Sequence, residues 1–294
     1  MIYTIENDYL SVSAETLGAQ LSSVRSKKTG TEYLWQGDPA YWTGRAYNLF
    51  PVVGRLYENQ YEYEGRSYRM DPHGFARKSE FVLCEKGKTH MVFALSANDG
   101  TAEQYPFSFI FRIRYSLAGN RLTVGYEVCN VGDKEMFYGL GGHPGFNVPF
   151  DGGAFEDYYI RFAEKCEPVV LSLGPNCLMS GEEKEYPLVG GREISLRHDL
   201  FPFDAIILRD ACRRLEIRGR HTSRSIGVEY PDMRYLGIWQ KPCSDAPYIC
   251  IEPWENLPSD EGKIQKLNEK DGIGRVGAGE TRYSTIVVTV NEED

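Results

Sequence analysis

Four short segments of the sequence combine polar or ionisable side chains with glycine, proline and aromatic residues: NLFPVVGRL, MDPHGFAR, GGHPGFN and CIEPWENLP. Two of them place a histidine, His73 or His143, beside a glycine and a proline, with a phenylalanine two or three residues further on. An imidazole held in an open pocket can donate or accept a proton near neutral pH. The fourth segment places the carboxylate of Glu252 inside an apolar strand, where a charged group needs a compensating role.

Each of these side chains also has a purely structural interpretation. His73 and His143 can be turn residues, and Glu252 can point to solvent by strand alternation. Arg55 of VVGRL can be a surface cation, and Asp204 of FPFDAIIL can be a strand-entry residue. The remaining histidines lie in charged or strand-edge contexts and are not predicted to act: His90, His198 and His221.

Several other chemistries lack the sequence motifs that they require. GLGGHPG does not continue into the Lys-Ser/Thr ending of a phosphate-binding loop, and no Gly-x-Ser-x-Gly segment occurs. His-Glu-x-x-His is absent, and no second histidine lies three to five residues from His73 or His143. A metal ion would need ligands from segments far apart in the sequence, so we predict that none is required.

The elements that must position these side chains are β-strands. In FSFIFRIRYS the alternate residues from Phe107 to Tyr115 are apolar, and RLTVGYEVCN repeats this pattern from Leu122 to Val128. The connecting LAGN and the NVGD that follows are typical of turns. No convincing amphipathic helix occurs. Further strands are predicted in these segments: FVLCEKGKTHMVFAL, AIILRDACRRLEIRG, SRSIGVEY, YLGIWQ, YICIEPW and RYSTIVVTV.

The sequence as a whole predicts an all-β protein. Its 294 residues contain no linker, internal repeat or low-complexity tract. Sandwiches and barrels of this length often form one domain, so we predict a single large antiparallel β-sandwich domain over residues 1–294.

Charge and cysteine content limit the partners and the compartment. The net charge of −9 disfavours binding to nucleic acid or to an anionic membrane surface. The N-terminal MIYTIENDYLSVSA has no signal-peptide pattern, and no segment approaches the roughly 18 apolar residues of a membrane helix. The seven cysteines are odd in number and form no Cys-x-x-Cys pair, which favours a reduced, cytoplasmic location.

Seven motifs, in this order, resemble the aldose 1-epimerase (galactose mutarotase-like) family, above all its bacterial LacX-type branch. They are LGAQLSSVRSKKTGTEYLWQGD, NLFPVVGRL, HGFAR, GGHPGFN, FDAIIL, GIWQKP and ICIEPW. Each motif is weak by itself, but together they extend from about residue 10 to the last predicted strand. The resemblance implies a large twisted β-supersandwich with an open cleft for a pyranose sugar, no organic cofactor and no general need for a metal ion.

The resemblance also implies a role for each candidate residue. Glu252 corresponds to the general base that takes a proton from the anomeric hydroxyl, and His143 to the acid that protonates the ring oxygen. His73, Arg55 and Asp204 correspond to residues that hydrogen-bond the sugar. For an apolar wall of the cleft, the candidates are three aromatic side chains: Trp239, Trp254 and Phe146.

These residue types suit the interconversion of anomers, which requires the sugar ring to open and to close from the other face. A carboxylate and an imidazole, with ordinary pKa values of about 4.3 and 6.5, can move the two protons if they lie on opposite sides. A nearby carboxylate favours the imidazolium form. We therefore predict that the glycines and the proline of GGHPGFN form a loop that presents His143 to the ring oxygen.

The sequence departs from the best-known galactose mutarotases, which leaves its substrate open. Its motif reads His-Pro-Gly-Phe-Asn where those enzymes usually carry His-Ser/Thr-Tyr-Phe-Asn. A phosphorylated hexose is one alternative, for which Arg45, Arg77 or Lys241 could supply positive charge. A non-catalytic carbohydrate-binding module is another, and it would not need Glu252 and His143 together. A polysaccharide lyase or hydrolase would want a longer groove than this chain length favours.

Overall fold

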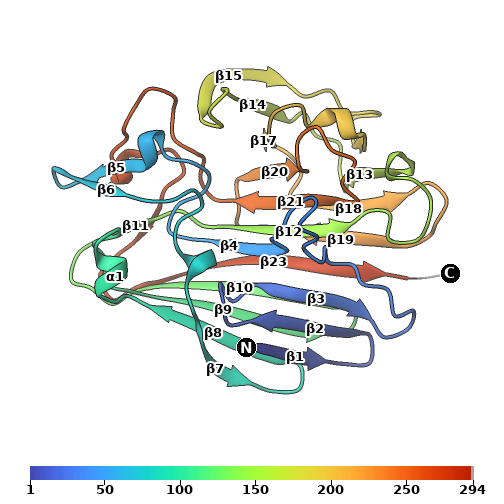
Figure 1. Ribbon diagram of the computed structural model, residues 1–294, viewed down its shortest axis with the longest axis horizontal. Coiled ribbons are helices and arrows are strands. Elements are labelled where there is room, and N and C mark those ends of the chain that lie inside the picture. Colours follow the sequence, from blue (N-terminus) through green and yellow to red (C-terminus); the bar gives the residue numbers. More distant parts are fainter. Residues whose placement is uncertain (293–294) are drawn as a thin grey trace.

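The computed structural model describes residues 1–292, and strands form most of its regular structure (Figure 1). The largest sheet has nine antiparallel strands in the order β16 (Glu193–Ser195), β13 (Tyr158–Phe162), β18 (Arg214–Gly219), β19 (Ser225–Glu229), β23 (Thr281–Asn291), β10 (Arg121–Asn130), β9 (Phe109–Ala118), β8 (His90–Ser96) and β7 (Val82–Lys86).

A second large sheet has seven antiparallel strands. Their order is β15 (Met179–Glu185), β14 (Val169–Leu173), β17 (Ile206–Arg209), β20 (Tyr235–Trp239), β21 (Tyr248–Trp254), β12 (Gly141–Asn147) and β4 (Ala46–Leu49). Strands far apart in the sequence are therefore neighbours: β12 pairs with β4 on one side and with β21 on the other.

Smaller elements complete the fold. They are the sheet β1 (Ile2–Glu6), β2 (Leu10–Glu15) and β3 (Leu21–Ser26), the pairs β5 (Gln60–Tyr63) with β6 (Arg66–Arg69) and β11 (Met136–Tyr138) with β22 (Gly274–Val276), the helix α1 (Asp99–Ala102), and the 3-10 turns η1 (Tyr57–Asn59), η2 (Ala76–Lys78), η3 (Phe155–Asp157), η4 (His198–Leu200) and η5 (Leu267–Glu269). Within residues 1–292, no helix is long and apolar enough to cross a membrane.

The two large sheets share one apolar core, which confirms the predicted antiparallel sandwich. The core contains Phe111 and Val124 from the nine-stranded sheet together with Ile238 and Ile251 from the seven-stranded sheet. In β9 buried and half-buried residues alternate along the strand, as period-2 patterning requires of a sheet with one covered face. The strand β10 occupies RLTVGYEVCN as predicted, and β9 begins at Phe109, two residues later than the apolar pattern.

One prediction about backbone shape is wrong. GGHPGFN is not a loop but the strand β12, and none of its glycines has a positive φ angle. The glycines serve close packing instead. A Cβ atom on Gly141 would lie 2.7 Å from Trp254 Cδ1, and one on Gly145 would lie 3.1 Å from Trp42 Cζ3. The segment is glycine-rich because large aromatic rings lie directly against its backbone.

Candidate active site

His143 and Glu252 face each other across two neighbouring strands of the seven-stranded sheet. The register of β12 and β21 pairs Gly141 with Trp254 and Gly145 with Cys250, which places His143 opposite Glu252 midway between these pairs. Because side chains alternate along a strand, Ile251 points into the core while Glu252 points to the opposite face. That face carries the candidate site.

The same transverse row continues over the adjacent strands. His143 pairs with Tyr47 of β4, and Glu252 pairs with Gly237 of β20. A Cβ atom on Gly237 would lie 2.9 Å from Trp254 Cζ2 and 3.2 Å from Glu252 Cβ. The absent side chain at Gly237 therefore leaves room for both the carboxyl group and the indole ring.

The imidazole and the carboxyl group are in direct contact and nearly inaccessible to water. His143 Nε2 lies 3.3 Å from Glu252 Oε1, and the two residues are 7% and 1% exposed. Glu252 thus does not face bulk solvent, as a purely structural role on an alternating strand would require. The imidazole stacks on Trp42, with ring centroids 4.8 Å apart and an angle of 25° between the planes.

Burial shifts the two pKa values in opposite directions. It raises the pKa of Glu252 well above its ordinary value, and the negative charge of Asp204 raises it further. Burial also lowers the pKa of His143 well below its ordinary value, helped by His73 and by the positive charge of Arg77. The neighbouring carboxylate was expected to favour the imidazolium form of His143, but burial lowers the pKa of His143 instead. Both shifts disfavour the charged forms, and because the two groups are in contact they titrate as one coupled pair.

A second histidine approaches the pair from the loop that follows β6. His73 has a φ angle of +65°, and its ring centroid lies 5.7 Å from that of His143. The backbone N–H of Gly54 donates to His73 Nδ1 at 3.2 Å, so the proton of the neutral ring is on Nε2. Burial, with Arg77 and Arg55, lowers the pKa of His73 to about 3. His73 is consequently a neutral hydrogen-bond donor.

Two guanidinium groups and one carboxylate lie at the cleft with these histidines. Arg55, Arg77 and Asp204 all line it, and among residues 1–292 neither arginine has an ion-pair partner. Arg77 lies over the Tyr47 ring, 5.2 Å from its centroid, and its Nε atom is buried without a hydrogen bond. The cleft thus offers two guanidinium groups that make no direct ion pair within the described part of the protein.

The cleft encloses about 340 Å³ and gathers most of the predicted residues. This volume is within the usual range for small-ligand sites. The predicted residues that line it are Arg55, His73, His143, Asp204, Trp239, Glu252 and Trp254.

Phe146 is the exception among the predicted site residues. It is 1% exposed and belongs to the apolar core between the sheets. The reason is strand parity: Phe146 is three residues from His143 on β12, so the two side chains point to opposite faces. It does not form a wall of the cleft.

Two residues that were not predicted, Trp42 and Tyr47, also line the cleft beside His143. Tyr47 could have been found by pairing AYNL with GGHPGFN, whereas nothing in the sequence places Trp42 over β12. Of the three basic residues considered for a phosphate, only Arg77 lines the cleft. Arg45 donates to the Gln36 carbonyl oxygen and Lys241 to that of Ala40.

Two buried polar atoms beside the pair have no hydrogen-bond partner among the described residues: His143 Nδ1 and Trp254 Nε1. A buried polar group without a partner is costly, so such atoms commonly mark where a ligand or water binds. Both side chains line the same cleft. Trp254 Nε1 is a donor near enough to Glu252 to moderate the rise in its pKa, and without a full hydrogen bond there it can serve an oxygen of a bound ligand.

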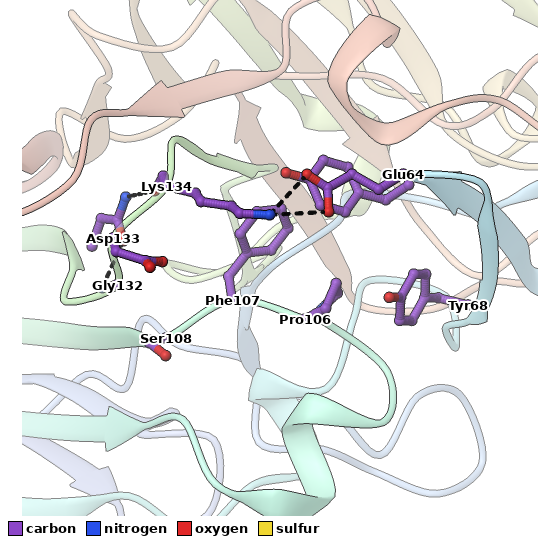
Figure 2. Close-up of a pocket in the computed structure, with 10 residues that line it drawn as sticks. Glu64, Tyr68, Pro106, Phe107, Ser108, Gly132, Asp133 and Lys134 are labelled. Carbon is purple, nitrogen blue, oxygen red and sulfur yellow. Dashed lines mark hydrogen bonds and ion pairs between the residues drawn. The ribbon is translucent and has the colours of Figure 1, made fainter.

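A separate depression lies between the β5–β6 hairpin and the residues that precede β9 (Figure 2). It encloses about 230 Å³ and is lined by Tyr63, Tyr68 and Phe107. Its charged residues Glu64 and Lys134 form an ion pair at 3.3 Å, as Figure 2 shows. This depression has no histidine or buried carboxylate, so it lacks an acid–base pair of the kind found in the cleft.

Comparison with known proteins agrees with this architecture. A family model described as aldose 1-epimerase matches residues 1–261. The chromosomal protein LacX of Lactococcus lactis subsp. lactis is 32% identical, with 99% of each chain covered. A galactose mutarotase related enzyme from Lactobacillus acidophilus is 33% identical with a TM-score of 0.94, covering 99% of this chain and 98% of the other. A galactose mutarotase-like protein from Lactobacillus casei ATCC 334 is 30% identical with a TM-score of 0.93, covering 99% of this chain and 100% of the other.

The fold and these relatives define the class of the protein, which is an isomerase that epimerises sugars. The chain belongs to the aldose 1-epimerase family, as its seven motifs indicated.

Proposed function

We propose that the protein interconverts the α and β anomers of a hexopyranose by general acid–base catalysis. The observation that carries the proposal is the buried contact between His143 and Glu252 at the floor of a cleft of ligand size. A module that only binds sugar gains nothing from a desolvated acid–base pair, because burying both groups costs stability.

In the proposed reaction Glu252 takes the proton of the C1 hydroxyl while His143 gives its proton to the ring oxygen. The C1–O5 bond breaks, C1 becomes an aldehyde, and rotation about the C1–C2 bond presents its other face. The two proton transfers then run in reverse and close the ring. A raised carboxyl pKa makes Glu252 a stronger base, and a lowered imidazole pKa makes His143 a stronger acid.

The other cleft residues are proposed to orient the sugar. His73 donates from Nε2 to a hydroxyl, because its Nδ1 is occupied by the backbone N–H of Gly54. Asp204 accepts from hydroxyl groups, and Arg55 donates to them. Trp239 and Trp254 supply apolar contact for the C–H faces of the ring, which is the common way that aromatic residues bind sugars in clefts.

A phosphorylated hexose is a second candidate substrate, and one observation favours it. Arg55 and Arg77 both line the cleft without an ion-pair partner among residues 1–292. Arginine suits phosphate because its planar guanidinium can donate two parallel hydrogen bonds. The reaction at C1 would be the same for either substrate.

Polarimetry or NMR of freshly dissolved α-D-glucose, α-D-galactose and their 6-phosphates tests both candidates. We expect catalytic amounts of the protein to accelerate the equilibration of at least one of them. Acceleration of the 6-phosphates alone would select the phosphorylated substrate. If a sugar binds in a calorimetric titration but no anomer equilibrates faster, the carbohydrate-binding module becomes the better description.

A further inference from the structure

A third metal-ligating side chain lies beside the His143–Glu252 pair. Cys250 precedes Glu252 by two residues on β21 and therefore points to the same face of the sheet. One ligand atom from each of His143, Cys250 and Glu252 can be chosen so that all three lie within 4.8 Å of one another. All three residues are buried.

We propose that this triad binds Zn²⁺, in competition with the sugar, so that zinc acts as a reversible inhibitor of the protein. The zinc site rests on the triad alone, whereas its inhibitory effect rests on the function proposed above. Zinc bound here would occupy the groups assigned as acid and base, so it is an inhibitor and not a cofactor.

The chemistry of the donors selects the ion. Nitrogen, sulfur and oxygen ligands from His, Cys and Glu are the set that zinc uses, and three protein ligands leave a fourth position open. Mg²⁺ and Ca²⁺ require several oxygen ligands, and the triad offers only one carboxylate. A thiolate beside an imidazole instead favours softer divalent ions such as Zn²⁺ and Co²⁺.

The distances fit a tetrahedral ion with a small adjustment. Zinc bonds to nitrogen and oxygen of about 2.0–2.2 Å hold two such ligands roughly 3.3–3.5 Å apart. His143 Nε2 and Glu252 Oε1 already lie 3.3 Å apart. The chosen ligand atoms of the triad all lie within 4.8 Å of one another, so closing them onto one ion needs movements of about 1 Å, which side-chain rotation allows.

The surroundings favour binding of one ion with displacement of protons. A thiol coordinates zinc as the thiolate, so binding through Cys250 releases the thiol proton. Aromatic side chains, among them Trp42 and Trp239, enclose this part of the sheet and keep water away. In such a dry site the attraction between a divalent cation and its anionic ligands is strong.

The test is a metal titration of the full-length protein after chelator treatment and dialysis. Calorimetry with Zn²⁺ should give one site per chain, and Co²⁺ should produce a thiolate-to-cobalt absorption band in the near ultraviolet. Cys250→Ser should abolish the band and weaken Zn²⁺ binding at least tenfold, the loss usual when metal coordination is impaired. Cys84→Ser is the matched control, because Cys84 is exposed on the distant strand β7, and it should behave like the wild type.

A second variant guards against a folding defect in Cys250→Ser. Glu252→Gln keeps the shape of the side chain but removes the anionic ligand, so it should also weaken Zn²⁺ binding at least tenfold. Unchanged Zn²⁺ affinity in folded Cys250→Ser, or no site in the wild type, overturns the proposal.

The substrate experiment is independent of the metal titration. A protein that binds Zn²⁺ through Cys250 but equilibrates no aldose refutes the proposed function and keeps the zinc site. With an active protein, Zn²⁺ should slow mutarotation and a chelator should restore it.

Discussion

His143 and Glu252 show how burial sets the chemistry of individual residues. In water, glutamate is a weak base for removing the proton of a sugar hydroxyl, and imidazolium is a weak acid for protonating the ring oxygen. Within the sheet, burial raises the pKa of Glu252 and lowers that of His143, so each charged form becomes more reactive. When the pair holds one proton, both groups are uncharged if the proton is on Glu252. If the proton is on His143, the two groups form an ion pair.

The first prediction at this scale concerns Glu252→Gln. Glutamine keeps the hydrogen-bonding shape of the side chain but cannot take the proton of the anomeric hydroxyl. We expect sugar affinity within a few-fold of the wild type and a kcat lower by roughly 10²–10⁴-fold, measured by polarimetry and calorimetry. Normal mutarotation by the folded variant would exclude Glu252 as the base.

The second prediction concerns pH. At pH values below the acidic limb the pair gains a second proton, so Glu252 is no longer a base. At pH values above the basic limb the pair loses its last proton, so His143 is no longer an acid. We therefore expect a bell-shaped profile of kcat/KM whose two limbs belong to the pair.

Glu252→Gln separates these two limbs. The variant has no carboxylate to protonate, so its residual activity should lose the acidic limb. It should keep the fall toward high pH, because the imidazole still loses its charged form as pH rises through its lowered pKa. An acidic limb that persists in the variant would mean that another group titrates there.

At the scale of elements, the site is one transverse row of a β-sheet. Tyr47, His143, Glu252 and Gly237 come from four neighbouring strands and meet because the strands are in register. Such a row holds side chains more rigidly than loops do, since backbone hydrogen bonds fix β20, β21 and β12 on both sides and β4 on one. Other side chains reach the cleft from outside the strands, among them Arg55, His73 and Asp204.

The prediction at this scale is that Gly237→Ala reduces activity by displacing its neighbours. The added methyl group would lie 2.9 Å from Trp254 Cζ2 and 3.2 Å from Glu252 Cβ, so the indole and carboxyl groups must move. We expect a loss of stability of roughly 1–3 kcal/mol. A shift of the carboxyl group by a fraction of an ångström should lower kcat/KM roughly tenfold or more.

Gly125→Ala is the matched control, because Gly125 also lies within a long strand but a Cβ atom there meets nothing closer than 3.9 Å. Thermal denaturation and polarimetry of both variants make the comparison. Equal activity of Gly237→Ala and Gly125→Ala would show that the row tolerates displacement.

At the scale of the whole molecule, the two large sheets depend on each other. Their facing residues form one core, so neither sheet can bury its apolar face without the other. The cleft lies on the opposite face of the seven-stranded sheet, where smaller clusters around Trp35 and Trp254 cover the strands. The site is therefore supported from below by the shared core.

We predict that residues 1–294 unfold as a single domain. The four tryptophans all lie on the cleft side of the seven-stranded sheet, in the two smaller clusters, whereas far-ultraviolet circular dichroism follows both sheets. Denaturant transitions measured by tryptophan fluorescence and by circular dichroism should therefore coincide. Two separate midpoints would divide the chain into independent units.

The sequence by itself determined many of the strands and the family. Period-2 alternation is a local property of the chain, so it placed β9, β10 and the later strands to within a few residues. The motifs also pointed to seven residues that line one cleft: Arg55, His73, His143, Asp204, Trp239, Glu252 and Trp254.

Only the tertiary structure decided how these residues work together. Strand pairing brings His143 opposite Glu252 although more than a hundred residues separate them, and it brings Cys250 beside them. Strand parity sends Phe146 into the core, and pairing with β4 and β21 makes a strand of the segment that was predicted as a loop. The direction of the pKa shifts was likewise not readable from residue types. It depends on how completely a group is removed from water, and that is a property of the packed sheets rather than of any segment of the chain.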